Sequence, residues 1–171
     1  LTTLREDSGK NYTEMNFTLF SSLIEFGSLD IGEAVRFTAP KAGWKLQKVR
    51  VLAWSGYNET TQSFPDERNI MLEIRDKDLN ILYKFADAQN NYFLSETGPL
   101  FGEIELPAVS VTGDFYVVFY DRGAAPIGME KSNGTGSSFL ISGSEIQPAD
   151  FTTVETNETI AINWLIEAVG N

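Results

Sequence analysis

The chain contains no cysteine and no histidine in its 171 residues. Without imidazole or thiolate side chains it cannot form a Ser-His-Asp triad, a cysteine nucleophile, an ordinary zinc site or a common haem site. The remaining options for catalysis are carboxylate chemistry and Ser-Lys chemistry, and no Ser-x-x-Lys motif is present. The lack of cysteine also excludes a disulfide framework, so cysteine usage does not indicate a redox compartment.

Basic residues are scarce, and long apolar runs are absent. Thirteen Lys and Arg stand against 24 Asp and Glu, which gives a net charge of −11 that would repel nucleic acid and anionic membrane surfaces. No stretch approaches the roughly 18 consecutive apolar residues that a membrane-spanning helix needs. Because the chain opens at Leu1, we expect a mature segment whose targeting or anchoring parts lie elsewhere, with membrane attachment only through such an anchor.

What the sequence does contain is typical of one all-β domain. Its length and its 42% hydrophobic content suit a single core spanning residues 1–171, with residues 1–31 as a less legible N-terminal edge segment. Segments rich in Val, Ile, Phe, Tyr and Trp recur between clusters of Gly, Pro, Asn and Asp. This pattern predicts a jelly-roll-like β-sandwich of about eight antiparallel strands, at residues 33–39, 44–54, 69–75, 79–85, 102–106, 114–120, 138–142 and 159–169.

Several local features refine this prediction. Residues 114–120 are apolar or aromatic on both faces, which indicates a central strand covered on each side. Within 69–75, Met71, Glu73 and Arg75 should face away from Leu72 and Ile74. We expect Pro107 to end the strand before it, and residues 15–20 to form an edge strand. Residues 55–68 and 122–138 are predicted to be long surface loops, where binding residues are often found.

Five Asn-x-Ser/Thr sequons, none with proline in the middle, predict N-glycosylation in an extracellular or cell-surface location. The alternative is chance occurrence in a polar surface rich in Asn and Thr. The acceptor residues are Asn11, Asn16, Asn58, Asn133 and Asn157.

A D-x-D-x-N run at Asp76, Asp78 and Asn80 has the spacing of calcium ligands in an EF-hand loop. Ile81 occupies the position where such a loop needs glycine, and Asp87 replaces the final glutamate. We therefore favour a hairpin turn and expect no cofactor. Calcium bound at this run, or by loop carboxylates such as Glu59, Asp66 and Glu67, is the alternative.

Aromatic side chains near the two loops are candidates for stacking on sugar rings. These ligand-binding candidates are Trp54, Tyr57, Tyr92 and Phe93. The competing interpretation is that such residues belong to the core or rim of the sandwich, as we expect for Trp44 and Trp164.

Most of residues 32–169 resembles a jelly-roll-like β-sandwich module found in the extracytoplasmic parts of archaeal surface and membrane-anchored proteins. The motifs concerned are strand cores and turns, so the resemblance implies a fold and a surface location but no catalytic residues. In such proteins the module stands beside other domains, including peptidase-like ones, and its own role is generally unassigned. The loops at Asn58 and Asn133 are longer here. The matching runs are residues 32–37, 44–54, 74–83, 111–118 and 163–166.

Taken together, these observations predict a non-enzymatic ectodomain that mediates adhesion or recognition, or acts as a structural surface module. Its partner would be a surface protein or a glycan, contacted through the loops at 55–68 and 122–138. A carbohydrate-binding module is the first alternative. A carboxylate-dependent glycoside hydrolase is the second, and it needs a cleft with two acidic groups about 5–10 Å apart.

Overall fold

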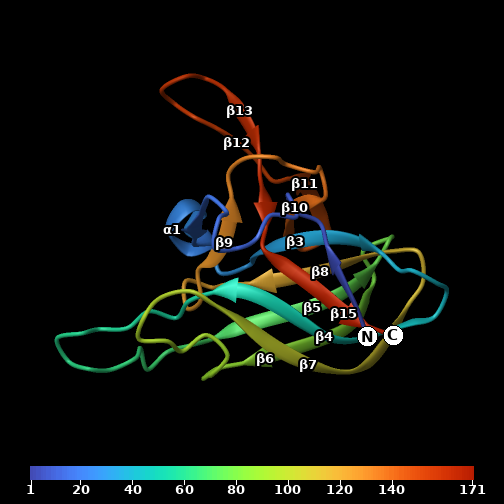
Figure 1. Ribbon diagram of the computed structural model, residues 1–171, viewed down its shortest axis with the longest axis horizontal. Helices are drawn as coiled ribbons and strands as arrows, with labels where there is room; N and C mark the ends of the chain where they lie inside the picture. The colour runs from blue at the N-terminus through green and yellow to red at the C-terminus, as the bar shows by residue number, and fades with distance from the viewer.

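The computed structural model describes all residues from Leu1 to Asn171 and confirms an all-β sandwich of antiparallel sheets. It has fifteen strands rather than about eight, because several loops predicted from the sequence contain short strands. Two sheets pack face to face, and a separate hairpin projects from one end (Figure 1). The five-residue α1 (Ser22–Phe26) is the chain's one helix, and no helix is long and apolar enough to cross a membrane.

The first sheet has β4 at its centre, with β7 on one side and both β15 and β9 on the other. β1 pairs with β15, while β2 and β14 pair with β9. Its seven strands are β1 (Thr2–Arg5), β2 (Phe17–Phe20), β4 (Trp44–Ala53), β7 (Leu100–Val111), β9 (Ile127–Glu130), β14 (Asn163–Trp164) and β15 (Ile166–Gly170).

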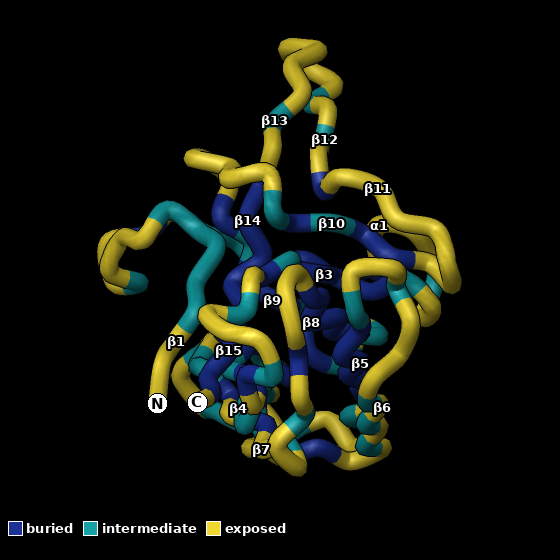
Figure 2. The backbone as a smooth tube through the Cα atoms, turned by 90° about the vertical axis from the view of Figure 1, so that its right-hand side faces the viewer, coloured by how far each residue is buried: buried dark blue, intermediate teal, exposed yellow.

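The second sheet has the order β11-β10-β3-β8-β5-β6. Its strands are β3 (Ile31–Thr38), β5 (Ile70–Asp76), β6 (Ile81–Asp87), β8 (Asp114–Tyr120), β10 (Ser138–Ser142) and β11 (Glu145–Pro148). The projecting hairpin consists of β12 (Asp150–Thr152) and β13 (Thr159–Ala161), and Figure 2 shows it exposed along most of its length.

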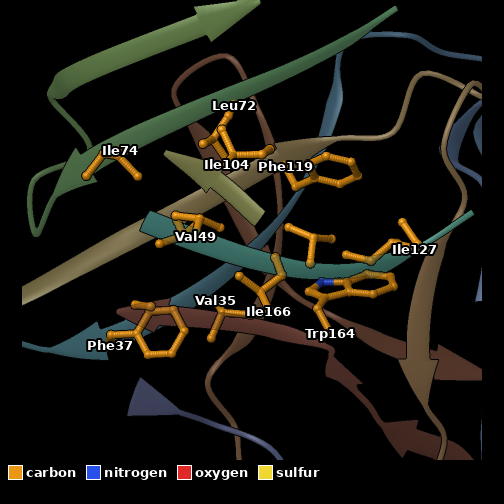
Figure 3. Packing of buried hydrophobic residues seen from close by; sticks show 14 of the residues in the cluster. Val35, Phe37, Val49, Leu72, Ile74, Ile104, Phe119, Ile127, Trp164 and Ile166 are labelled. Atoms are coloured by element: carbon orange, nitrogen blue, oxygen red, sulfur yellow. The ribbon is translucent and has the colours of Figure 1, made fainter. Parts of the chain in front are cut away.

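The core lies between the two sheets and follows the two-residue alternation of the strands. Val35 and Phe37 of β3 and Leu72 of β5 point inward from the second sheet, where they meet Val49 of β4 and Trp164 of β14 (Figure 3). All five side chains are almost fully buried. The alternating segments thus pack as two layers, and this fixes which face of each strand points outward.

β8 is the central strand that its sequence predicts, since it lies between β3 and β5 and is buried on both faces. Phe115, Val117 and Phe119 point into the core. Tyr116, Val118 and Tyr120 point to the outer face of the second sheet, where they form a smaller apolar cluster with side chains from β3, β5 and β10.

β7 corrects the expectation that Pro107 ends a strand. The strand continues to Val111 through an irregularity opposite Leu46 and Lys48, where Ala108 adopts a φ of 55°. β4 is the single strand neighbour of β7. Proline is tolerated at such an edge position because its missing N–H leaves no ladder bond unmade.

Two further segments differ from the prediction. The expected loop at 122–138 contains β9, which lies inside the first sheet, and the expected last strand at 159–169 is divided into β13, β14 and β15. Between residues 21 and 31 the chain forms α1, where the Ser21 hydroxyl accepts a hydrogen bond from the Ile24 amide and Gly27 closes the helix at a φ of 63°. These are ordinary capping residues in a segment too short for helical periodicity to be recognised.

The N-terminal segment is an integral part of the sandwich. Beyond the pairing of β1 and β2, it crosses the outer face of the first sheet. Met15 is buried there against Leu52 and Leu165, and Tyr12 packs on Phe101 with ring centroids 4.4 Å apart. The segment therefore covers apolar surface that the first sheet would otherwise expose.

Candidate functional site

The four aromatic ligand candidates do not form one exposed platform. Phe93 has no exposed surface and packs edge-on against Phe119 in the core, so its prediction as a ligand contact is wrong. The half-buried Trp54 donates its indole N–H to the Ser95 carbonyl oxygen at 2.8 Å. Tyr92 packs against Phe85 and Phe93. Three of the four candidates thus serve as core or rim residues.

Tyr57 lies apart from the others, in the 55–68 loop. Its ring packs on Phe64 with centroids 5.0 Å apart, beside a shallow pocket that also includes Asn58 and Pro65. The other residues that line this pocket are Gly56, Glu59 and Ser63. It therefore offers one aromatic ring rather than a stacking platform.

The run at Asp76, Asp78 and Asn80 forms the turn between β5 and β6. The Asp76 carboxylate accepts hydrogen bonds from the backbone amides of Asp78 (2.9 Å) and Asn80 (3.0 Å) and from the Asn80 side-chain amide (3.1 Å). Desolvation raises the pKa of Asp76, but these hydrogen bonds outweigh it and lower the pKa below its usual value. The contacts are those of a hairpin turn, and no group of three or more acidic side chains in the chain is arranged to hold a metal ion.

All five sequon asparagines are exposed, and they are spread over separate surface segments. Asn11 and Asn16 lie on the N-terminal segment, Asn58 in the 55–68 loop, Asn133 after β9 and Asn157 near the tip of the β12–β13 hairpin. Asn133 and Asn157 adopt left-handed backbone angles, with φ values of 62° and 54°, as asparagine often does in turns. Each acceptor is thus on the outside of the folded domain.

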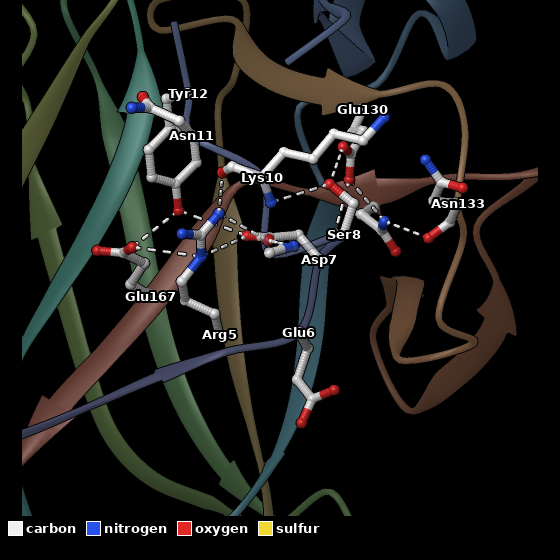
Figure 4. Close-up of polar contacts among 12 residues, drawn as sticks. Arg5, Glu6, Asp7, Ser8, Lys10, Asn11, Tyr12, Glu130, Asn133 and Glu167 are labelled. Carbon is white, nitrogen blue, oxygen red and sulfur yellow. Dashed lines mark hydrogen bonds and ion pairs between the residues drawn. The ribbon is translucent and has the colours of Figure 1, made fainter. Parts of the chain in front are cut away.

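The outer face of the first sheet is closed by polar contacts from the N-terminal segment (Figure 4). Glu167 of β15, 3% exposed, accepts a hydrogen bond from the Tyr12 hydroxyl at 2.7 Å and forms ion pairs with Arg50 and Arg5. Burial, followed by the hydrogen bond to Glu167, raises the pKa of Tyr12, which therefore remains a hydrogen-bond donor. Arg5 also pairs with Asp7 at 2.8 Å, which folds the segment back on itself.

A second buried carboxylate, Glu130 of β9, holds the same segment further along. It accepts hydrogen bonds from the Ser8 amide at 3.0 Å, from the Ser8 hydroxyl and from the Asn163 side-chain amide at 2.8 Å. Both carboxylates on this face therefore have several protein donors. Neither Glu130 nor Glu167 is therefore left open to a ligand.

The outer face of the second sheet, by contrast, carries an open groove of about 770 Å³. We call this the outer groove. One wall is the β5–β6 turn at residues 79–81, the other is the β10–β11 turn at residues 142–144, and Asp30 lies at its rim. Its floor consists of four almost fully buried side chains, Met71, Glu73, Arg75 and Tyr120.

The floor of the outer groove is a hydrogen-bonded polar cluster. Glu73 Oε1 accepts from Arg75 Nε at 3.1 Å, from Arg75 Nη2 at 2.7 Å and from the Tyr120 hydroxyl at 2.6 Å. Arg75 Nη1 donates to the Gly143 carbonyl oxygen at 2.7 Å, which ties the β10–β11 turn to the floor. Three donors therefore converge on Oε1, whereas no protein donor contacts Glu73 Oε2.

Tyr120 remains protonated within this cluster. Burial, followed by the hydrogen bond to Glu73, raises the pKa of Tyr120, so the phenol stays protonated and donates. Arg75 Nη2 and Glu73 Oε1 form an ion pair in which the two atoms are 2.7 Å apart. A buried ion pair contributes little net stability, because both charges lose water.

Sequence reasoning placed Glu73 and Arg75 correctly on the face opposite Leu72 and Ile74, but it did not anticipate their burial. Alternation distinguishes the two faces of a strand and says nothing about what covers the outward face. Burial here depends on the β10–β11 turn, whose Gly143 is 68 residues from Arg75 in the chain. The one local sign of this burial in the sequence is that a Glu and an Arg lie two residues apart, on the same face of a strand rich in apolar residues.

Another pair of buried carboxyl groups lies inside the sandwich, away from the groove. Glu33 of β3 is fully buried and faces Asp121, which accepts hydrogen bonds from the amides of Ser22 (3.1 Å) and Gly123 (2.7 Å). Burial, then the hydrogen bond and the charge of Asp121, raise the pKa of Glu33 well above its usual value. Glu33 thus keeps its proton to a higher pH than an exposed glutamate does, close to the start of α1.

In comparisons with known proteins, no family model, no curated protein and no solved structure matches the chain. The resemblance to archaeal surface modules stays a prediction. The case for a function therefore depends on the geometry of the groove and on the exposed sequons.

Proposed function

We propose that the protein is a non-enzymatic extracytoplasmic module for adhesion or recognition at a cell surface, and that it contacts its ligand in the outer groove. The observation that carries this proposal is the buried Glu73, which has one oxygen saturated by Arg75 and Tyr120 and the other without a protein donor. Glu73 lies on the outer face of the second sheet, whereas the N-terminal segment packs on the first sheet. The groove takes the place of the two long loops as the proposed contact surface.

A role in binding rather than catalysis is supported by the chemistry of the groove floor. A glycoside hydrolase needs one carboxylic acid that gives up its proton and a second carboxylate across the scissile bond. Glu73 is instead paired with Arg75, and the chain has neither histidine nor cysteine to supply other acid–base or nucleophilic groups. We therefore assign the cluster to ligand recognition.

The extracytoplasmic location is supported by the exposure of all five sequon asparagines. We expect the chain purified from its native host to be heavier than its sequence mass by one or more glycans, with glycopeptides at Asn11, Asn16, Asn58, Asn133 or Asn157. Intact-mass measurement before and after enzymatic or chemical deglycosylation tests this. An unmodified chain from the native host would count against the proposed location, while leaving the groove as a binding site.

The binding role of the groove is tested by backbone amide NMR spectra of the ¹⁵N-labelled chain, titrated with a panel of neutral oligosaccharides, acidic oligosaccharides and lysine-rich peptides. We expect at least one class to shift the amides of residues 71–75 and 142–144. The amides of the N-terminal segment at residues 5–12 serve as the internal control, because this segment lies over the first sheet and not beside the groove. If every shift were confined to the 55–68 loop, the groove would not be the site.

A further inference from the structure

We propose that the outer groove binds a neutral polyhydroxylated ligand, a sugar chain, with one hydroxyl donating to Glu73 Oε2 and another accepting from Arg75 Nη1. This inference rests on the proposed function, because it names the ligand class of the same groove. Arg75 Nη1 has two N–H groups, of which the Gly143 carbonyl oxygen takes one. An acceptor and a donor are therefore presented by a single ion pair on the groove floor.

The charge of the floor selects against ionic ligands. Glu73 and Arg75 together are neutral, so the attraction of either charge for an ionic ligand is offset in part by the opposite charge beside it. Anions are further disfavoured by Asp30 at the rim and by the net charge of −11. A hydroxyl both donates and accepts without carrying charge, so adjacent hydroxyls satisfy both atoms.

The walls of the outer groove offer the apolar and polar contacts that a bound sugar needs. Leu79 and the half-exposed Ile81 give one wall an apolar surface, on which the C–H face of a sugar ring can pack. The exposed Asn80 and Ser144 add polar atoms at the rim: the Asn80 side-chain nitrogen donates to Asp76, which leaves its oxygen free, and the Ser144 hydroxyl has no protein partner. The groove volume lies within the range of about 300–1,000 Å³ that is usual for small-ligand sites.

The test is an NMR titration of the intact ¹⁵N-labelled chain with neutral oligosaccharides, with acidic oligosaccharides and a lysine-rich peptide as separate arms. We expect a neutral oligosaccharide to shift the amides of residues 71–75, 79–81 and 142–144 in a saturable manner, and the charged arms to leave them unchanged.

A variant pair makes the test specific. Ser144→Lys puts a long side chain over the groove from an exposed turn, and it should weaken oligosaccharide binding by about tenfold or more, which corresponds to about 1.4 kcal/mol. Ser110→Lys is the matched control, at an exposed position on β7 of the first sheet, and it should bind as the unmodified chain does. Tyr120→Phe, which keeps the ion pair and removes the hydroxyl, should weaken binding less than Ser144→Lys.

Each contrary result would overturn a different part of the proposal. Groove shifts from a charged ligand, with none from neutral sugars, would overturn the ligand class and leave the recognition function intact. Neutral sugars that shift amides elsewhere, or whose affinity is the same for Ser144→Lys and Ser110→Lys, would overturn the sugar site in the groove. A groove that responds to no arm of the panel would overturn the proposed site together with its ligand class.

Discussion

Replacing Glu73 with alanine is expected to destabilise the domain by about 3–5 kcal/mol, because the change leaves the Arg75 guanidinium buried without its counter-charge. The same change removes the acceptor of the Tyr120 hydroxyl. Urea unfolding followed by tryptophan fluorescence measures the effect as a lower midpoint at an unchanged slope.

The matched control for Glu73→Ala is the double variant Glu73→Leu with Arg75→Met. Replacement of a buried ion pair by apolar side chains of similar volume is often neutral, so the double variant should recover most of the stability that Glu73→Ala loses. Glu105→Ala, at a largely exposed carboxylate on β7, should change stability little. If Glu73→Ala were as mild as Glu105→Ala, the floor of the groove would not be a tightly coupled buried cluster.

The second large expected effect is a dependence of the stability of the domain on pH. Because the pKa of Glu33 is raised in the folded state, the folded chain keeps a proton that the unfolded chain releases above the usual glutamate range. The stabilisation is therefore complete at pH values below the unfolded pKa, and it is lost as the pH rises towards the folded pKa. We expect stability to fall as the pH rises above the usual glutamate range, with a contribution from this pair of up to about 1.4 kcal/mol per pH unit.

Glu33→Gln should separate this effect from the general repulsion of an acidic chain. The amide cannot ionise and can still donate to Asp121, so the variant should be more stable than the unmodified chain at pH 8 and should show a flatter pH dependence. Glu25→Gln, at an exposed position on α1, removes the same charge without touching the pair and should keep the original slope. Equal slopes for the two variants would contradict the role of Glu33.

The parts of the fold that could be predicted from sequence are those set by local pattern. The bounds of β8 and β10 and the start of β4 follow from apolar periodicity with a turn residue nearby, such as Gly113 and Pro40. The parts that could not be predicted depend on distant partners. β7 continues past Pro107 because β4 supports it along its length, and β9 is a strand because β2 and β14 pair with it.

The same distinction applies to the candidate sites. Short sequence motifs predict the sequons and the turn at Asp76, because both depend on residues within a few positions of one another. Phe93 was misassigned because a loop aromatic near a polar stretch gives no local sign of entering the core. The outer groove was missed for the opposite reason, since Glu73 and Arg75 resemble the solvated face of an ordinary strand until the β10–β11 turn is placed beside them.

The projecting hairpin affects how the domain would respond to proteases. Val154, near its tip, is completely exposed, and the strands that flank the tip pair with each other and with no other strand. Cleavage between residues 153 and 158 would therefore leave both fragments held together, because β14 and β15 are bound within the first sheet. A glycan on Asn157 would shield residues 153–158 from attack, so a chain without it would be converted more readily into a nicked, non-covalent pair of fragments.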